Sequence, residues 1–315
     1  MASIGAAVDF AVARNGTLAY RPAPNSPREL VWLDRSGNEM SSPFASNSYD
    51  GLALSPDGRT AAVVVSEAGR PNIWLYRSDG TKRTSFAENS ACPVWSPDGK
   101  QLAYITLNRG HGDIVVRPAD HSAPEQLLIA ATTERAPSGW SPDGKFIVFI
   151  EHEQPPANKY SIWTIPVGGP AAGPLLFLRT SFSHSQGVLS PDGKWMAYWS
   201  NQAGPMEVFV SDYPDHRWTY QVSNHGGERP LWRSDGRELF FLDHLRRVVV
   251  SPVTKTGSGL TFGKPQILFQ GQSTFWGSPF ATVDGRRFLA IHTPTPQPSG
   301  PQSLVVVLNV VTPSP

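Results

Sequence analysis

The chain has little cysteine: Cys92 is the only one among 315 residues, so no internal disulfide can form. Nothing around it has the spacing of a metal-binding cysteine cluster, and we interpret Cys92 as a small buried apolar residue. Neither sign of charge is in excess, with 27 Lys plus Arg against 26 Asp plus Glu, and no basic run alternates with aromatic residues. These absences exclude the sequence footprint of a nucleic-acid-binding protein.

The sequence also lacks any run of about 18 apolar residues, the length that a membrane-spanning helix needs. Residues 1–20 lack a charged start followed by an apolar stretch, so no signal peptide is expected. No amphipathic helical pattern of useful length is present either. The chain nevertheless contains 39% hydrophobic residues and 10 Trp, which is enough for a large core. We expect a folded, soluble chain.

One tetrapeptide, Ser-Pro-Asp-Gly, recurs along the chain. Pro presets the second position of a tight turn, Asp accepts hydrogen bonds from nearby amides, and Gly takes the positive φ that ends the turn. Four copies are intact, those at 233–236 and 282–285 are degenerate, and 14–16 is a weaker seventh. Their glycines stand at 16, 58, 99, 144, 193, 236 and 285, so successive copies lie 41 to 49 residues apart. A period near 40 to 50 residues is typical of propeller blades.

Short apolar runs flank each turn and indicate strands. Residues 93–95 precede a turn and 101–105 follow it, and both runs are rich in β-branched or aromatic residues. A third apolar strand such as 114–116 follows each pair, and then a more polar fourth one. Because the inner strands are almost continuously hydrophobic, both faces of each small sheet should be covered by neighbours. The sequence therefore predicts an all-β fold: a single propeller of four-stranded antiparallel blades over residues 1–315.

The order of a strand, Ser-Pro-Asp-Gly, a second strand and an Ile-Trp or Val-Phe strand resembles the TolB-like, WD-like propeller repeat of bacterial proteins. The sequence segments 30–37 and 238–242 resemble parts of the carboxy-terminal propeller of bacterial serine/threonine kinases. That resemblance implies a sensor or scaffold module downstream in a longer kinase-like protein. The kinase's own motifs are absent from this chain, as is the Gly-x-Ser-x-Gly elbow of serine hydrolases, so neither activity is expected.

Blade number follows from the turns. Seven turn signals predict seven blades, with six as the alternative because TolB-like propellers usually have six. The last repeat would end with a strand at 303–308, and closure would then require a strand from the amino end, at 2–8.

In a propeller, ligands usually meet the loops that enter the innermost strands and those that join second and third strands. These loops should present the binding residues. The candidates are Tyr49, Asp50, Arg135, His184, Gln186, His225, Glu228, Arg229 and Trp276, with Glu134 as a further acid or base. Loops collect polar residues in any fold, and Glu228 beside Arg229 is typical of a surface ion pair, so no residue is assigned as catalytic.

Six of the eight histidines fall on these loops: His111, His152, His184, His225, His244 and His292. We interpret most of these six histidines as solvent-exposed loop residues without a metal. His184 and His225 lie nearest the expected channel and are the only pair that we consider as metal ligands, although no short metal-binding spacing supports them.

We expect a non-enzymatic recognition module that binds a protein, a peptide or a small ligand such as a glycan, without a cofactor. The first alternative is an enzyme that resembles the oligogalacturonate lyase type of TolB-like propeller, with a divalent metal held by channel histidines. A second is a spacer or assembly platform. The residues alone assign no location. The resemblance is consistent with a periplasmic one, and otherwise we expect a cytoplasmic one.

Overall fold

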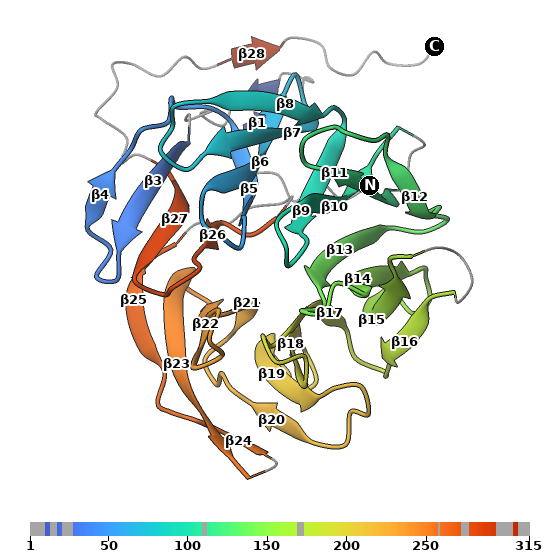
Figure 1. Ribbon diagram of the computed structural model, residues 1–315. Coiled ribbons are helices and arrows are strands. Elements are labelled where there is room, and N and C mark those ends of the chain that lie inside the picture. Colours follow the sequence, from blue (N-terminus) through green and yellow to red (C-terminus); the bar gives the residue numbers. More distant parts are fainter. Residues whose placement is uncertain are drawn as a thin grey trace. The chain divides into compact units, whose positions relative to one another are not determined.

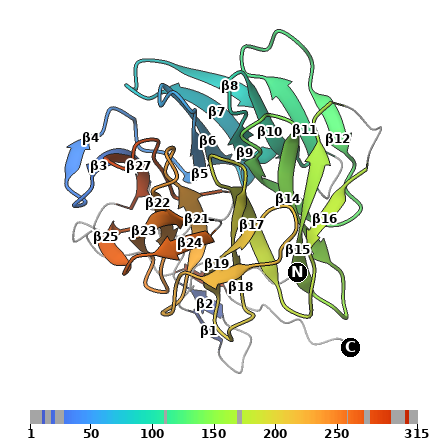
Figure 2. The ribbon, with the colours of Figure 1, turned by 60° about the horizontal axis from the view of Figure 1, so that its bottom comes forward.

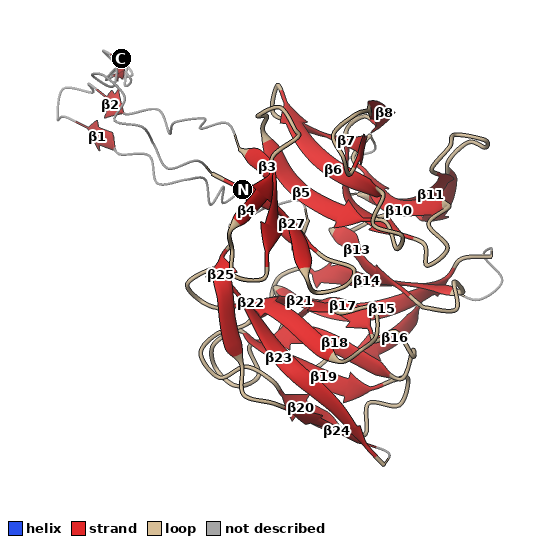
Figure 3. Ribbon diagram, turned by 60° about the vertical axis from the view of Figure 1, so that its left-hand side comes forward, coloured by secondary structure: helices blue, strands red, loops and turns tan. Residues whose placement is uncertain are grey.

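The computed structural model describes residues 10–12, 18–20, 28–108, 112–168, 173–257, 259–271, 277–293 and 305–307. All regular elements among them are strands (Figure 3). Accordingly, no helix in the described part of the chain could span a membrane. Contacts divide the chain into two compact units, Arg28–His292 and the end segments Met1–Pro27 with Thr293–Pro315. The assignment of residues 1–315 to one domain stays a prediction, because the blades account for the first unit only.

Six antiparallel sheets form this first unit and follow one another around a ring (Figure 1; Figure 2). Blade 1 holds β5 (Tyr49–Leu54), β6 (Thr60–Glu67), β7 (Arg70–Arg77) and β8 (Arg83–Ala87). Blade 2 holds β9 (Ser90–Trp95), β10 (Gln101–Thr106), β11 (Asp113–Pro118) and β12 (Gln126–Ile129). Blade 3 holds β13 (Arg135–Trp140), β14 (Phe146–Glu153), β15 (Lys159–Pro166) and β16 (Leu175–Leu178).

The other three blades complete the ring. Blade 4 holds β17 (His184–Leu189), β18 (Trp195–Ser200), β19 (Glu207–Asp212) and β20 (Thr219–Gln221). Blade 5 holds β21 (Glu228–Trp232), β22 (Glu238–Leu242), β23 (Arg247–Thr256), β24 (Gly259–Phe262) and β25 (Gln266–Gln270). Blade 6 takes strands from both ends of the unit: β26 (Phe280–Ala281), β27 (Arg287–His292), β3 (Glu29–Asp34) and β4 (Glu39–Ser41).

The prediction of an all-β propeller with four-stranded blades is confirmed, but the prediction of seven blades is wrong. The weakest turn signal, at Gly16, lies outside the described residues. The strands on either side of it, β1 (Phe10–Val12) and β2 (Leu18–Tyr20), pair with each other, and β2 pairs with β28 (Val305–Val307). These three strands make a separate sheet in the second unit.

Closure also differs from the prediction. Strand β27 pairs with β3, and Leu289 stands opposite Trp32 in that register. The last turn repeat therefore receives its third and fourth strands from residues 29–41. The expected closing strand at 2–8 lies outside the described residues, and the strand found within 303–308 is β28 of the separate sheet.

The buried side chains of the described residues form six hydrophobic clusters, one at each junction between neighbouring blades. Second strands are buried along most of their length, as in β10, whose Leu102 and Tyr104 are fully covered. Each sheet is too small to bury its own faces and is covered by the next one, which explains the continuous apolar runs in the sequence.

Each intact tetrapeptide closes the turn between the first and second strands of a blade. At Ser141, the hydroxyl donates to Asp143 Oδ1 at 2.7 Å and accepts from the Phe146 amide at 2.9 Å. The Ser141 hydroxyl holds the pKa of Asp143 below its usual range. Gly144 takes a φ of +76°. A Cβ at Gly144 would lie 3.8 Å from Pro97 of the preceding turn, so the turns also contact one another around the ring.

We expect Ser141→Ala to lower the free energy of unfolding by about 1 to 2 kcal/mol, because the Phe146 amide loses its acceptor and Asp143 loses a donor. Urea-induced unfolding measures the change. Ser41→Ala, at an exposed serine of the outer strand β4, is the control and should stay within about 0.5 kcal/mol of the parent. Equal midpoints for the two variants would show that the turn serine does not stabilise the blade.

Candidate functional site

The entering ends of the inner strands mark one face of the propeller. Strands β5, β9, β13, β17, β21 and β26 are the innermost of their blades. Because the strands are antiparallel, the loops that enter inner strands and those that join second and third strands lie on one face, which we call the mouth face. The tetrapeptide turns lie on the other, which we call the turn face.

A bulge interrupts the inner strand of each of blades 1 to 5. In three of them a residue other than glycine adopts a left-handed backbone: Cys92 with φ 55°, Gln186 with φ 51° and Arg229 with φ 58°. Such a conformation costs about 1 to 3 kcal/mol per residue, and it is found most often at functional sites. The backbone is therefore strained where the inner strands meet the mouth face.

Charged groups gather beside these bulges. Arg28 Nη1 donates to Asp50 Oδ1 at 3.0 Å and to the Tyr49 carbonyl at 2.8 Å. Arg229 Nη1 donates to the Gly277 carbonyl at 2.8 Å, which ties blade 5 to the entrance of blade 6. Burial lowers the pKa of Arg229, while Cys92 and Asp50 act in the opposite direction.

Cys92 does not provide a nucleophile. Burial raises the pKa of its thiol to about 12, although the nearby Arg229 opposes the shift. The thiolate is the reactive form of cysteine, and at neutral pH this side chain remains a thiol. Together these residues offer hydrogen bonds and charge at the mouth face rather than covalent chemistry.

Several predicted site residues have structural partners. Tyr49 is buried, and its hydroxyl donates to the Ala45 carbonyl at 2.5 Å. Arg135 is paired with Glu151 of its own blade, its Nε donating to Glu151 Oε1 at 2.8 Å. Glu228 forms an ion pair with Arg246, another neighbour within one blade.

The two candidate metal ligands lie in different surroundings. His184 is fully buried, and its Nε2 shares a hydrogen bond of 2.7 Å with Thr180 Oγ1. His225 is exposed, and its Nδ1 donates to the Asn224 carbonyl at 2.6 Å. Within the described part of the chain, no group of three or more His, Cys, Asp or Glu could hold a metal.

The remaining predicted residues vary in exposure and partners. His152 lies against Tyr160 with 4.7 Å between ring centroids, and its Nδ1 is 3.8 Å from Glu134. His244 is exposed, and its Nδ1 donates to the His225 carbonyl. The Oε1 atom of Gln186 is buried without a hydrogen-bond partner in the described structure. His292 is half-buried at the end of β27. Trp276 and His111 lie outside the described residues.

Three apolar side chains on the mouth face were missed by the sequence analysis. Phe182, Met206 and Leu245 are 42%, 38% and 52% exposed on loops of blades 4 and 5. Hydrogen bonds connect these loops to their neighbours. The Ser183 amide donates to the Asn201 side chain, and the Gly227 amide donates to the Met206 carbonyl. The His244 side chain donates to the His225 carbonyl. We call Phe182, Met206 and Leu245 the apolar arc. The available signal was a large hydrophobic residue in an otherwise polar loop, entering an inner strand at Phe182 and joining second and third strands at Met206 and Leu245.

Comparison with known proteins agrees with this architecture. The chain is 37% identical over 89 residues to the Tol-Pal system protein TolB of Alcanivorax borkumensis, a match that covers 27% of the chain and 20% of that relative's length. The structure of a putative TolB from Agrobacterium tumefaciens matches with a TM-score of 0.65 and 17% identity, over 84% of this chain and 98% of that one.

A second solved structure, an oligogalacturonate lyase in complex with manganese, matches with a TM-score of 0.50 and 12% identity, over 82% of this chain and 73% of that one. At these identities both structures show a shared fold alone. The TolB β-propeller domain family matches residues 52–261, about two thirds of the sequence. On that match and on the blades described above, the chain belongs to the TolB β-propeller domain family.

Proposed function

We propose that this propeller is a non-enzymatic recognition module that binds a protein or peptide across its mouth face. The apolar arc is the observation that carries the proposal. Exposed apolar side chains that gather on one face, rimmed by polar residues, are typical of protein interaction sites. Two of the three arc residues are Phe and Met, which are enriched in protein interfaces.

The inner-strand bulges beside the arc support the same proposal. Arg229 brings a partly buried guanidinium to the channel entrance, and Gln186 brings an amide oxygen without a partner in the described structure. Exposed apolar side chains together with a few hydrogen-bonding groups suit a segment of a partner protein, because interfaces combine apolar anchors with about ten direct hydrogen bonds. As proposed, this recognition needs no cofactor.

The family relationship also supports a protein partner. One relative is named for the Tol-Pal system, and only a fifth of that relative is matched by this chain. We propose that the propeller serves as the recognition part of a larger assembly or of a longer protein, a kinase-like parent among them. Nothing in the described residues favours the metal-dependent alternative, whose two histidines have separate partners.

The test is affinity capture with a tagged chain in an extract of the organism of origin. A variant that carries Phe182→Ser, Met206→Ser and Leu245→Ser should retain the partner at least about tenfold less than the parent, since each apolar contact contributes about 1 kcal/mol or more. Quantitative mass spectrometry of the retained proteins provides the measurement.

The matched control replaces three somewhat more exposed apolar residues on outer strands with serine: Met40, Leu127 and Leu175, which are 60%, 46% and 55% exposed. This control should retain the partner as the parent does. The proposal fails if the arc variant retains every partner of the parent, or if the control loses the same partner to the same extent.

A further inference from the structure

Blade 5 carries a hairpin that the other blades lack in the described structure. Its third strand, β23, has 10 residues, whereas the third strands of the other blades have 6 to 8. The first half of β23 pairs with β25, which is the regular fourth strand. The second half pairs with β24 instead and extends beyond the blade.

This hairpin packs across the junction between blades 4 and 5. Leu260 of β24 belongs to the same buried cluster as Trp195 and Trp232. Phe262 contacts Tyr220 of blade 4, with 5.8 Å between ring centroids. Lys255 Nζ donates to Asp192 Oδ2 of blade 4 at 2.7 Å. The hairpin thus covers the turn face where two blades meet.

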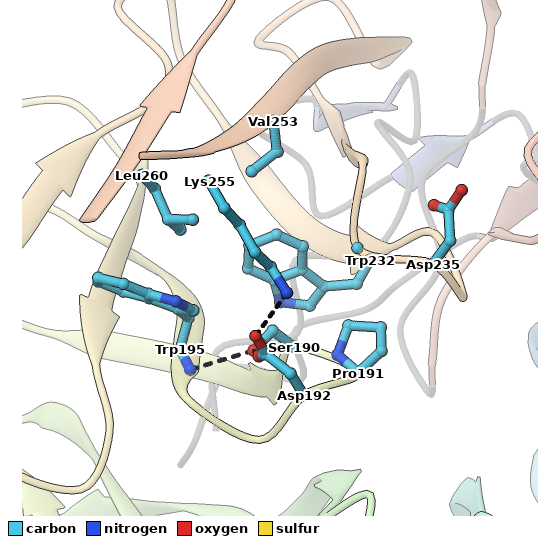
Figure 4. Close-up of a pocket in the computed structure, with 10 residues that line it drawn as sticks. Ser190, Pro191, Asp192, Trp195, Trp232, Asp235, Val253, Lys255 and Leu260 are labelled. Carbon is cyan, nitrogen blue, oxygen red and sulfur yellow. Dashed lines mark hydrogen bonds and ion pairs between the residues drawn. The ribbon is translucent and has the colours of Figure 1, made fainter. Parts of the chain in front are cut away.

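A pocket of about 180 Å³ lies beneath the hairpin (Figure 4). Its apolar wall includes Trp195, Trp232 and Leu260, while Asp192, Asp235 and Lys255 contribute charged groups. An apolar cavity of about 150 Å³ accommodates benzene, so the volume here suits one six-membered ring with small substituents. Figure 4 shows the Lys255 side chain extending toward Asp192.

The Asp192 carboxylate can accept a hydrogen bond from a ligand. Its Oδ1 accepts the Ser190 hydroxyl at 2.6 Å and so belongs to the turn. Its Oδ2 accepts Lys255, and a carboxylate oxygen can accept a further hydrogen bond. Asp192 and Lys255 therefore place an acceptor and a donor side by side at an indole-lined wall.

These walls suit a ring with an apolar face and a hydroxyl edge. A purely apolar ring would shield the Lys255–Asp192 ion pair from water without hydrogen-bonding to it, and that desolvation is unfavourable. An anionic ring would meet two carboxylates, which repel it. Ring C–H groups can pack on the indoles, while hydroxyls donate to Asp192 and accept from Lys255.

We propose that the pocket between blades 4 and 5 binds one neutral pyranose ring, as a free sugar or as the end of a glycan. This site is on the turn face and is independent of the partner recognition proposed for the mouth face. Its ligand contacts come from the tetrapeptide turn of blade 4 and from the added hairpin of blade 5.

Isothermal titration calorimetry of the full chain tests this assignment with four probes: the methyl pyranosides of glucose, galactose, mannose and N-acetylglucosamine. At least one should bind saturably, and Asp192→Asn and Lys255→Met should each weaken its affinity by about tenfold or more, since each removes a charged hydrogen-bonding group. A trisaccharide of the preferred sugar that binds with the same affinity as the monosaccharide would show that the site accepts the end of a glycan as well as a free sugar.

The matched control is Asp98→Asn, at the same position of an intact turn in blade 2. Asp98 accepts Ser96 at 2.6 Å as Asp192 accepts Ser190, so the two variants alter the turn alike and only one alters the pocket. Affinity should be unchanged in this control. The proposal is overturned if none of the four probes binds, if Asp98→Asn weakens binding as much as Asp192→Asn, or if glucuronate or tetramethylammonium binds more tightly than every neutral sugar.

Discussion

Replacing Phe288 with Ala should lower the free energy of unfolding by about 3 to 5 kcal/mol, as expected for a fully buried phenylalanine. Phe288 on β27 is fully buried at the junction between blades 5 and 6. Its ring centroid lies 5.2 Å from those of Phe240 and Phe269. The substitution removes these contacts and leaves a cavity that the surrounding sheets cannot fill.

Urea-induced unfolding measures this loss. Phe149→Ala, in the cluster between blades 2 and 3, should cost a similar amount because a closed ring depends on every junction. Leu176→Ala is the surface control, since Leu176 is 47% exposed, and it should change stability by less than about 0.5 kcal/mol. A loss below about 1 kcal/mol for Phe288→Ala alone would show that blade 6 does not close the ring.

The second large effect is a pH dependence that arises from His184. Burial lowers the pKa of His184 from 6.5 to about 4, and the nearby His216 and Lys159 act in the same direction. Between pH 6.5 and pH 4 the unfolded chain binds a proton at this residue that the folded chain does not bind. The folded state therefore loses about 3 kcal/mol of stability from this group as the pH falls through that window, and it has the full contribution above pH 6.5.

Comparing unfolding at pH 7 and pH 4 isolates this contribution. His184→Gln should lose about 3 kcal/mol less than the parent on acidification, whatever its stability at pH 7. His225→Gln is the control, because His225 is exposed, and it should follow the parent at both pH values. Parallel pH profiles for the parent and His184→Gln would contradict the assignment.

The sequence predicted the blades well because the tetrapeptide acts locally. Ser141 and Asp143 satisfy one turn almost entirely from within it, so the motif identifies a hairpin wherever it occurs. The motif does not say which strands a hairpin joins next. The signal at Gly16 therefore suggested a seventh blade, while pairing such as Leu289 opposite Trp32 joins distant segments and leaves no local pattern.

The site was predicted less well because partners decide what a side chain can do. Arg135 stands on the expected inner strand, yet Glu151 pairs with it. His184 is at the expected end of β17, yet the core covers it. The bulges at Cys92 and Arg229 had one readable signal: a proline follows each of them, and within a sheet proline is confined to edge strands and bulges.

Blade 6 has a consequence for synthesis of the chain. Residues 29–41 leave the ribosome first among the blades, but their pairing partner β27 is made only at the end of the unit. Until then β3 lacks its neighbour in the sheet, Val31 and Leu33 lack the Phe288 side chain of their cluster, and five assembled blades form an open arc with two apolar ends. Since closing a loop between distant segments is slow, the nascent arc should depend on chaperones until residue 292 has emerged.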